Sequence, residues 1–285
     1  MGTVSLTDTQ RLDGVSMCGA GHSGSTLLGM VLSGLPEAFY MGEGGKVRYL
    51  NNDRYPMRKR VCKICGEDCP IWSVFSWDRS RPLYSQIAAH TGARLVIDST
   101  KSTDWIAERT GELFQAGGQS HLIQLLRDGR AVVNSRLRKY PDRDPEAEIQ
   151  HWMTQISKSM VFFESFDGPK LRVRYESLAT EPDTEIRNIC AFLGQPFNDD
   201  LLDYHERDHH PLGGNNGTQY AAARHRFRNP DAIFATVGPS RKAFYDSRPP
   251  AIALDDRWKD EMTEEHAMLF DRMAGSFNEP MRWGD

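Results

Sequence analysis

Eight residues near the start of the chain carry its strongest chemical signal. They read GAGHSGST, from Gly19 to Thr26, between a short apolar run and an apolar pattern of helical spacing. Small residues let backbone N–H groups converge on an anion, and a helix N-terminus adds a partial positive charge. The spacing is that of a phosphate-binding loop, G-x-x-x-x-G-[KS]-[ST]. The alternative is a glycine-rich turn without a ligand.

One position of this loop narrows the choice of ligand. NTP-hydrolysing loops carry a lysine after the second glycine, where it reaches the β and γ phosphates. This chain has Ser25 at that position. The loop therefore favours a ligand with a shorter phosphate chain than ATP or GTP.

Two further segments, together with this loop, resemble a known family. HLIQLLRDGRAVVNS places Arg127 and Ser135 eight residues apart, and RYESL follows at Arg174 to Leu178. All three segments are similar to motifs of sulfotransferases that use 3′-phosphoadenosine-5′-phosphosulfate (PAPS), and they occur in that family's order. The resemblance is to bacterial-type members, with a Gly-Glu segment like that of tyrosylprotein sulfotransferases.

The resemblance implies a function and a set of cofactor-binding residues. The expected reaction moves the sulfuryl group of PAPS to a hydroxyl or amine of an acceptor, leaving PAP, without a catalytic metal. The loop would hold the 5′-phosphate, while Arg127 and Ser135 would hold the 3′-phosphate; a planar guanidinium suits a phosphate because it binds through two donors. The residues expected at the cofactor are Gly21, His22, Ser23, Gly24, Ser25, Thr26, Arg127, Ser135, Arg226 and Arg228.

Three residues are expected to take part in the chemistry. Family members usually have arginine or lysine where this chain has His22, so either bound PAPS keeps His22 protonated or Lys101 supplies the cation. The acceptor also needs a base, and the resemblance implies Glu43, in the Gly-Glu segment. A helix cap or a surface glutamate is the alternative for Glu43.

A cysteine cluster and a histidine-rich loop raise the question of a metal. Cys62, Cys65 and Cys69 could supply most of a tetrahedral zinc site, or they could be free thiols or a disulfide. The segment DYHERDHHPLGGNN contains three histidines, and we expect these to be solvated because the segment is typical of a loop.

Predicted strands and helices alternate along the sequence that contains these residues. Apolar runs at Val15 to Cys18, Arg94 to Ile97, His121 to Leu126 and Leu171 to Tyr175 predict buried parallel strands. Helical stripes lie at 27–35, 149–163, 186–193 and 262–273. The pattern predicts a P-loop-like three-layer α/β/α fold with a central parallel sheet. We expect one domain over 1–285, a flexible N-terminus over 1–13, and segments 40–90 and 196–256 covering the acceptor and cofactor, the latter as a long loop region.

Composition limits the partners. The 285 residues carry 35 Lys+Arg against 39 Asp+Glu, a net charge of −4, which argues against general nucleic-acid binding. The chain has no apolar run long enough to span a bilayer, and five cysteines favour a reducing cytoplasm over a secreted disulfide framework.

The acceptor is expected to be a small molecule or natural product. The rival interpretations are a P-loop small-molecule kinase and a non-catalytic PAP-binding protein.

Overall fold

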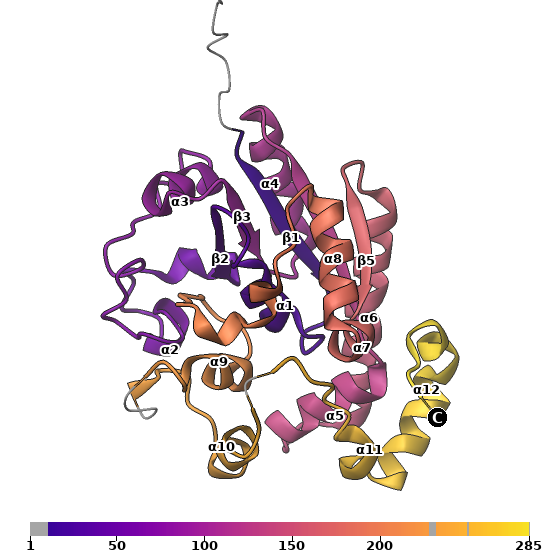
Figure 1. Ribbon diagram of the computed structural model, residues 1–285. Coiled ribbons are helices and arrows are strands. Elements are labelled where there is room, and N and C mark those ends of the chain that lie inside the picture. Colours follow the sequence, from indigo (N-terminus) through magenta and orange to yellow (C-terminus); the bar gives the residue numbers. More distant parts are fainter. Residues whose placement is uncertain (1–10, 228–231, 250, 285) are drawn as a thin grey trace, which may run out of the picture.

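Five parallel strands form the centre of the molecule (Figure 1). The computed structural model describes residues 11–227, 232–249 and 251–284. The strands are β1 Asp13–Gly19, β2 Ala38–Gly42, β3 Leu95–Asp98, β4 Ser120–Leu126 and β5 Lys170–Arg174, in the spatial order β2-β3-β1-β4-β5. Because every neighbouring pair is parallel, all carboxyl ends lie along one edge of the sheet. Ligands of open α/β sheets bind at that edge.

Helices connect the strands and cover the sheet. The α-helices are α1 Ser25–Leu32, α2 Met57–Arg60, α3 Leu83–Thr91, α4 Thr103–Gln115, α5 Gly129–Lys139, α6 Pro145–Ser165, α7 Tyr175–Thr180, α8 Pro182–Leu193, α9 Asn216–Ala223, α10 Pro239–Asp246, α11 Trp258–Glu261 and α12 Glu264–Asn278. Short 3-10 helices are η1 Gly44–Tyr49, η2 Asp199–Leu202, η3 Tyr204–Glu206 and η5 Glu279–Met281.

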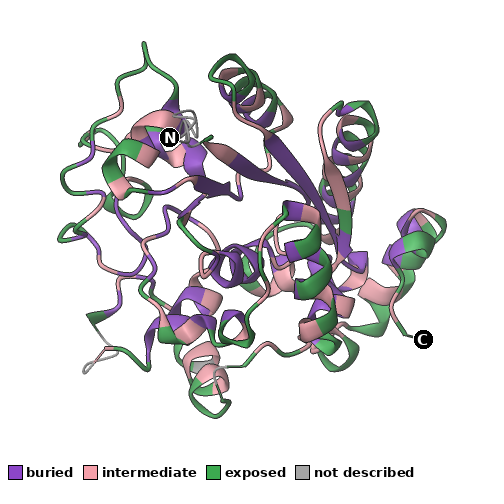
Figure 2. Cartoon of the chain, turned by 45° about the horizontal axis from the view of Figure 1, so that its top comes forward, coloured by how far each residue is buried: buried purple, intermediate pink, exposed green. Residues whose placement is uncertain are grey.

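The two faces of β4 show how the layers are built. All seven residues of this strand are buried, and successive side chains point to opposite faces. Leu122 packs with residues of α4 and α6, whereas Ile123 and Leu125 belong to the cluster that includes α1 and α8. Figure 2 shows the buried strands between helices whose outer faces are exposed. The predicted three-layer α/β/α fold is confirmed.

Local signals fix the ends of the long helices. The Asp144 carboxylate accepts a hydrogen bond from the Ala147 N–H at 3.0 Å, and Pro145 occupies the first turn of α6. Helix α8 also has a proline in its first turn, and it ends at Gly194, whose φ of 64° is left-handed. The stripes expected at 149–163 and 186–193 lie within these two helices.

Some elements of the fold were not expected from the sequence. Strand β2, which contains the apolar run from Ala38 to Met41, was not expected. Segment 196–256 is not simply a loop, since it contains α9 and α10. Helix α9 is capped by Asn215, whose side chain accepts from the N–H groups of Gly217 and Thr218. Residues 1–10 of the expected flexible N-terminus lie outside the described residues.

In the part of the chain that the structure describes, no helix has both the length and the apolarity needed to cross a bilayer.

Candidate active site

Each of the five strands is followed by a residue that lines one cavity of about 740 Å³. Strand β1 leads into the phosphate loop. Glu43 directly follows β2, Lys101 lies three residues after β3, Arg127 directly follows β4 and Tyr175 directly follows β5. The structure therefore brings together residues that are distant in the sequence, at the edge of the sheet where ligands bind.

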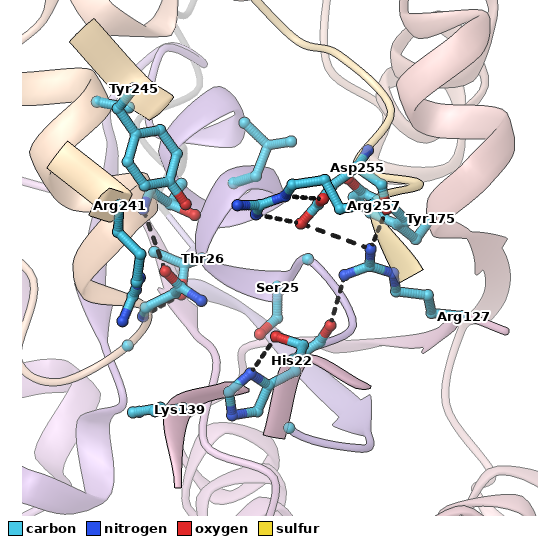
Figure 3. Close-up of a pocket in the computed structure, with 18 of the residues that line it drawn as sticks. His22, Ser25, Thr26, Arg127, Lys139, Tyr175, Arg241, Tyr245, Asp255 and Arg257 are labelled. Atoms are coloured by element: carbon cyan, nitrogen blue, oxygen red, sulfur yellow. Dashed lines mark hydrogen bonds and ion pairs between the residues drawn. The ribbon is translucent and has the colours of Figure 1, made fainter. Parts of the chain in front are cut away.

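The phosphate loop has the backbone expected of an anion site. Gly24 precedes α1 with a left-handed φ of 92°, and no side chain of the described residues caps this helix. Its first N–H groups can therefore serve an anion. A Cβ atom at Gly24 would lie 2.5 Å from the Tyr175 ring. The packing of this ring against the loop therefore requires glycine at position 24. Ser25 and Thr26 begin the helix and line the cavity (Figure 3).

The remaining loop residues differ in their placement. Gly21 and His22 line the cavity as expected. Ser23 is buried beneath it, and its hydroxyl has no hydrogen-bond partner within the described residues. Only the backbone of Ser23 is consistent with the expected contact to a phosphate.

His22 lies between the two expected phosphate sites. Its φ of 69° is unusual for a residue with a side chain, and its Nδ1 lies 2.9 Å from Ser135 Oγ. Burial, with the neighbouring charges of Lys139, Arg136, Arg127 and Lys101, lowers the pKa of His22 to about 3. Without a bound anion, His22 is therefore neutral at neutral pH.

Arg127 supports the loop as well as lining the cavity. The guanidinium is buried; Nη1 donates to the His22 carbonyl at 3.0 Å and Nη2 donates to the Asp255 carbonyl at 2.5 Å. It also lies over the Tyr175 ring, with Cζ 4.1 Å from the ring centroid. These contacts hold the phosphate loop against the segment after α10, as Figure 3 shows.

Glu43 is held by its backbone and by a lysine. Its N–H donates to the Leu212 carbonyl at 2.5 Å, and its Oε2 lies 2.8 Å from Lys46 Nζ. Burial alone would raise the pKa of Glu43, but the charges of Lys101 and Lys46 and a hydrogen bond from the Gly214 backbone outweigh burial and lower it. The carboxylate is therefore ionised at neutral pH.

Lys101 lies close to this carboxylate. Its Nζ donates to the Ser99 carbonyl at 2.5 Å. Burial lowers the pKa of Lys101, and the charges of Glu43 and Asp98 offset this only in part. Asp98 itself accepts from the Gly44 N–H at 2.9 Å, so the end of β3 also fixes the turn that carries Glu43. Glu43 and Lys101 thus line the same cavity.

Cations predominate along the cavity wall. The basic lining residues are Lys101, Arg127, Arg136, Arg138, Lys139, Arg143, Arg224, Arg241, Arg248 and Arg257, against the carboxylates of Glu43 and Asp255 among the described residues. Such a cavity attracts a polyanion. Arg241, Arg248 and Arg257 were not expected at the site. Their segment contains no recognisable motif, and only the fold brings these three side chains to the cavity wall.

The expected arginines of the RHRFRNP segment are not confirmed at the cavity. Arg226 does not line it; its Nε lies 3.0 Å from Asp208 Oδ1, on a partly exposed surface. Arg228 lies outside the described residues. The neighbouring Arg224 lines the cavity instead.

The expectation of solvated histidines in the 203–216 loop is wrong. The His209 side chain is buried, and its Nε2 lies 2.7 Å from the Tyr204 carbonyl. His210 lies beside Cys65 and Cys69, with Nδ1 at 3.3 and 3.5 Å from their sulfur atoms. The polar composition hid the fact that this loop packs against the rest of the chain.

A parallel sheet whose strand ends hold a phosphate-type loop, a carboxylate and several cations is typical of proteins that bind nucleotides or other phosphate esters. The model of the sulfotransferase family matches residues 15–199, so the chain belongs to that family. The sulfotransferase resemblance is thereby confirmed at the level of the family.

Solved structures share the fold. A sulfotransferase domain from the curacin biosynthetic pathway has a TM-score of 0.60 at 18% identity, over 94% of this chain and 98% of the domain. A sulfotransferase domain from the Synechococcus PCC 7002 olefin synthase has a TM-score of 0.57 at 20% identity, over 94% and 97%. A mouse sulfotransferase complexed with PAP has a TM-score of 0.50 at 12% identity, over 94% of this chain and 88% of the mouse protein.

One sequence relative extends the comparison. A Caenorhabditis briggsae protein provisionally named a protein-tyrosine sulfotransferase is 29% identical over 93 residues. That match covers 30% of this chain and 33% of the relative's length.

Proposed function

We propose that this chain transfers the sulfuryl group of PAPS to a hydroxyl or amine of a small-molecule acceptor. The observation that carries the proposal is the meeting of Glu43, Lys101 and the phosphate loop at one cavity. Glu43 is ionised there and can accept a proton, while the loop and the lysine favour negative charge. Family membership supports the same reaction.

The donor groups of the cavity suit the three anionic groups of PAPS. Backbone N–H groups from His22 to Thr26, with the Ser25 and Thr26 hydroxyls, would hold the 5′-phosphate. Arg127 and Ser135 would hold the 3′-phosphate, with Arg138 and Lys139 nearby in the same lining. A mouse sulfotransferase that shares the fold was solved in complex with PAP, which supports PAP as the ligand of this cavity.

The reaction needs one proton transfer and one displacement. The Glu43 carboxylate takes the proton of the acceptor, whose oxygen or nitrogen bonds to sulfur as the bond from sulfur to the 5′-phosphate oxygen breaks. The electron pair of that bond leaves with PAP. Lys101 opposes the developing negative charge. In this proposal Lys101 is the permanent cation, because the pKa of about 3 leaves His22 neutral until an anion binds.

Aromatic and apolar residues of the C-terminal part also line the cavity and could contact an apolar acceptor. Tyr204, Phe244, Tyr245 and Leu254 line it, and Figure 3 shows Tyr245 near Thr26 of the loop. A cavity of about 740 Å³ has the size of small-molecule sites in general. Two neighbours in fold are domains of biosynthetic assemblies, which also supports a natural-product acceptor. We place the reaction in the cytoplasm, as the cysteine content predicts.

A panel of acceptors tests this function. The purified protein is incubated with PAPS and phenols, sugars, alkanols or amines, and the products are identified by mass spectrometry. A sulfated product from one class, formed without added metal, is expected. Phosphorylated product from ATP and Mg²⁺ would instead identify a small-molecule kinase. PAP binding without product from any acceptor would indicate a non-catalytic PAP-binding protein.

A further inference from the structure

Four metal-binding side chains from two distant segments meet outside the cavity. The ligand atoms of Cys62, Cys65, Cys69 and His210 all lie within 4.8 Å of one another. Cys62 and Cys69 are fully buried, and none of the four lines the large cavity. His210 is separated from Cys65 by 145 positions in the sequence, so the fold, not local spacing, completes the set.

The distances from His210 to two of the sulfur atoms match those of a tetrahedral zinc site. His210 Nδ1 lies 3.3 Å from Cys65 Sγ and 3.5 Å from Cys69 Sγ. Zinc bonds of about 2.3 Å to sulfur and about 2.0 Å to nitrogen give a tetrahedral N···S edge of roughly 3.5 Å. The N–H groups of Ile64 and Cys65 also point at Cys62 Sγ, each at 3.4 Å. Such donors stabilise a thiolate, which is the form that binds a metal.

We propose that these four residues bind one structural Zn²⁺ ion. Three thiolates and one imidazole form a closed Cys₃His site, the ligand set of structural zinc. Binding replaces the three thiol protons, which pass to solvent, by three Zn–S bonds and involves no redox step. A span of 4.8 Å leaves room for a single ion but not for a cluster of metals. Sulfur and nitrogen ligands select zinc over magnesium or calcium.

The surrounding chain also favours a metal. Between η1 and α3, residues 50–82 contain only the four-residue α2 as described helix or strand. Irregular segments of this length are uncommon unless something holds them. A zinc ion would cross-link this segment to the 203–216 loop, as structural zinc does in small modules.

The ion would also fix the position of Glu43, an inference that rests on the proposed function. Next to His210, the Pro211 carbonyl accepts from the Lys63 N–H at 2.9 Å. The next residue, Leu212, donates its N–H to the Met41 carbonyl at 2.9 Å and accepts from the Glu43 N–H. The zinc ligands are therefore one to three residues from contacts that orient the base.

Metal content tests the site itself. Wild-type protein, purified under reducing conditions without chelator, should contain about one zinc ion per chain when measured by inductively coupled plasma mass spectrometry. His210→Ala should lose most of this zinc, whereas His210→Cys should keep it because a Cys₄ site also binds zinc. Cys190→Ala, which removes a buried thiol of α8, is the matched control and should keep the metal. A disulfide within the cluster, or thiols that stay reduced and bind no added zinc, would overturn the proposal.

Kinetics test the link to Glu43. Loss of zinc in His210→Ala should lower kcat by roughly 10²-fold through misplacement of the base. It should also move the acid limb of the pH profile upward, and His210→Cys should restore both. A fall in kcat without a shift of that limb would contradict the positioning role. Stoichiometric zinc in a wild-type protein that sulfates nothing would leave the metal site standing and remove the proposed function instead.

Discussion

The surroundings of Glu43 and Lys101, the proposed base and cation, shift the pKa values of both side chains. The pKa of Glu43 is lowered because nearby lysines and a backbone N–H outweigh its burial. The pKa of Lys101 is lowered because burial outweighs its carboxylate neighbours. Over the pH range between these two pKa values, the pair therefore carries the charges that the reaction needs.

The pH dependence of kcat/KM follows from these directions. Activity should rise with pH as Glu43 loses its proton, with a limb below the ordinary glutamate value of about 4.3, and fall as Lys101 loses its proton, below about 10.4. Lys101→Arg should move the alkaline limb upward, because arginine remains charged. An activity limb near pH 6.5 that disappears in His22→Ala would contradict this assignment and identify His22 as the titrating group.

The sequence predicted part of the site. The phosphate loop was selected from its spacing and Lys101 from its place after a strand, whereas Glu43 and Arg127 were selected on the sulfotransferase resemblance. Arg241 and Arg257 could not be selected, because a lone arginine in an irregular segment has the same local signal whether it faces solvent or a cavity. His210 was misjudged for the same reason.

At the scale of elements, the 212–215 segment links the base to the phosphate loop. A Cβ atom at Gly213, where φ is 73°, would lie 2.5 Å from Lys46 Nζ and 2.7 Å from Glu43 Oε2. Two residues on, the Asn215 N–H donates to Thr26 Oγ1 at 3.0 Å. The segment therefore contacts both Glu43, the proposed base, and Thr26 of the phosphate loop.

Gly213→Ala tests this link. The new methyl group should displace the Glu43 and Lys46 side chains and lower kcat by roughly 10²-fold, while PAP affinity, measured by calorimetry, stays near the wild-type value. Gly92→Ala is the control, since Gly92 has a similar φ of 76° but nothing within 4 Å of its Cβ position. Equal losses in both variants would show that backbone strain, not contact with Glu43, causes the effect.

The sequence predicted which segments form strands better than it predicted the order of the strands in the sheet. Four strands were expected because their apolar runs are continuous, as burial on both faces requires. Edge position and burial do not explain why β2 was missed, because β5 at the opposite edge was expected although only Val173 of it is buried. No local pattern specifies which strands are neighbours, so the meeting of Glu43 and Lys101 at one edge became visible only in the fold.

For the whole molecule, the charge distribution matters more than the net charge. The chain carries −4 overall, yet the described cavity lining is strongly basic. The excess of acidic groups therefore lies elsewhere, and the positive field is focused on one site. This arrangement fits a small polyanion held at the sheet edge and explains why composition alone gave no indication of the ligand.

The rates at which the wild-type protein and Glu43→Gln form sulfated acceptor show whether Glu43 is the base of a sulfuryl transfer. With PAPS and the best acceptor of the panel, the wild-type protein should form sulfated product, and Glu43→Gln should form it roughly 10²- to 10⁴-fold more slowly because the base is lost. PAP should raise the melting temperature of both proteins alike, which shows that the cofactor site is intact. Equal rates of product formation in the two proteins would show that Glu43 is not the base.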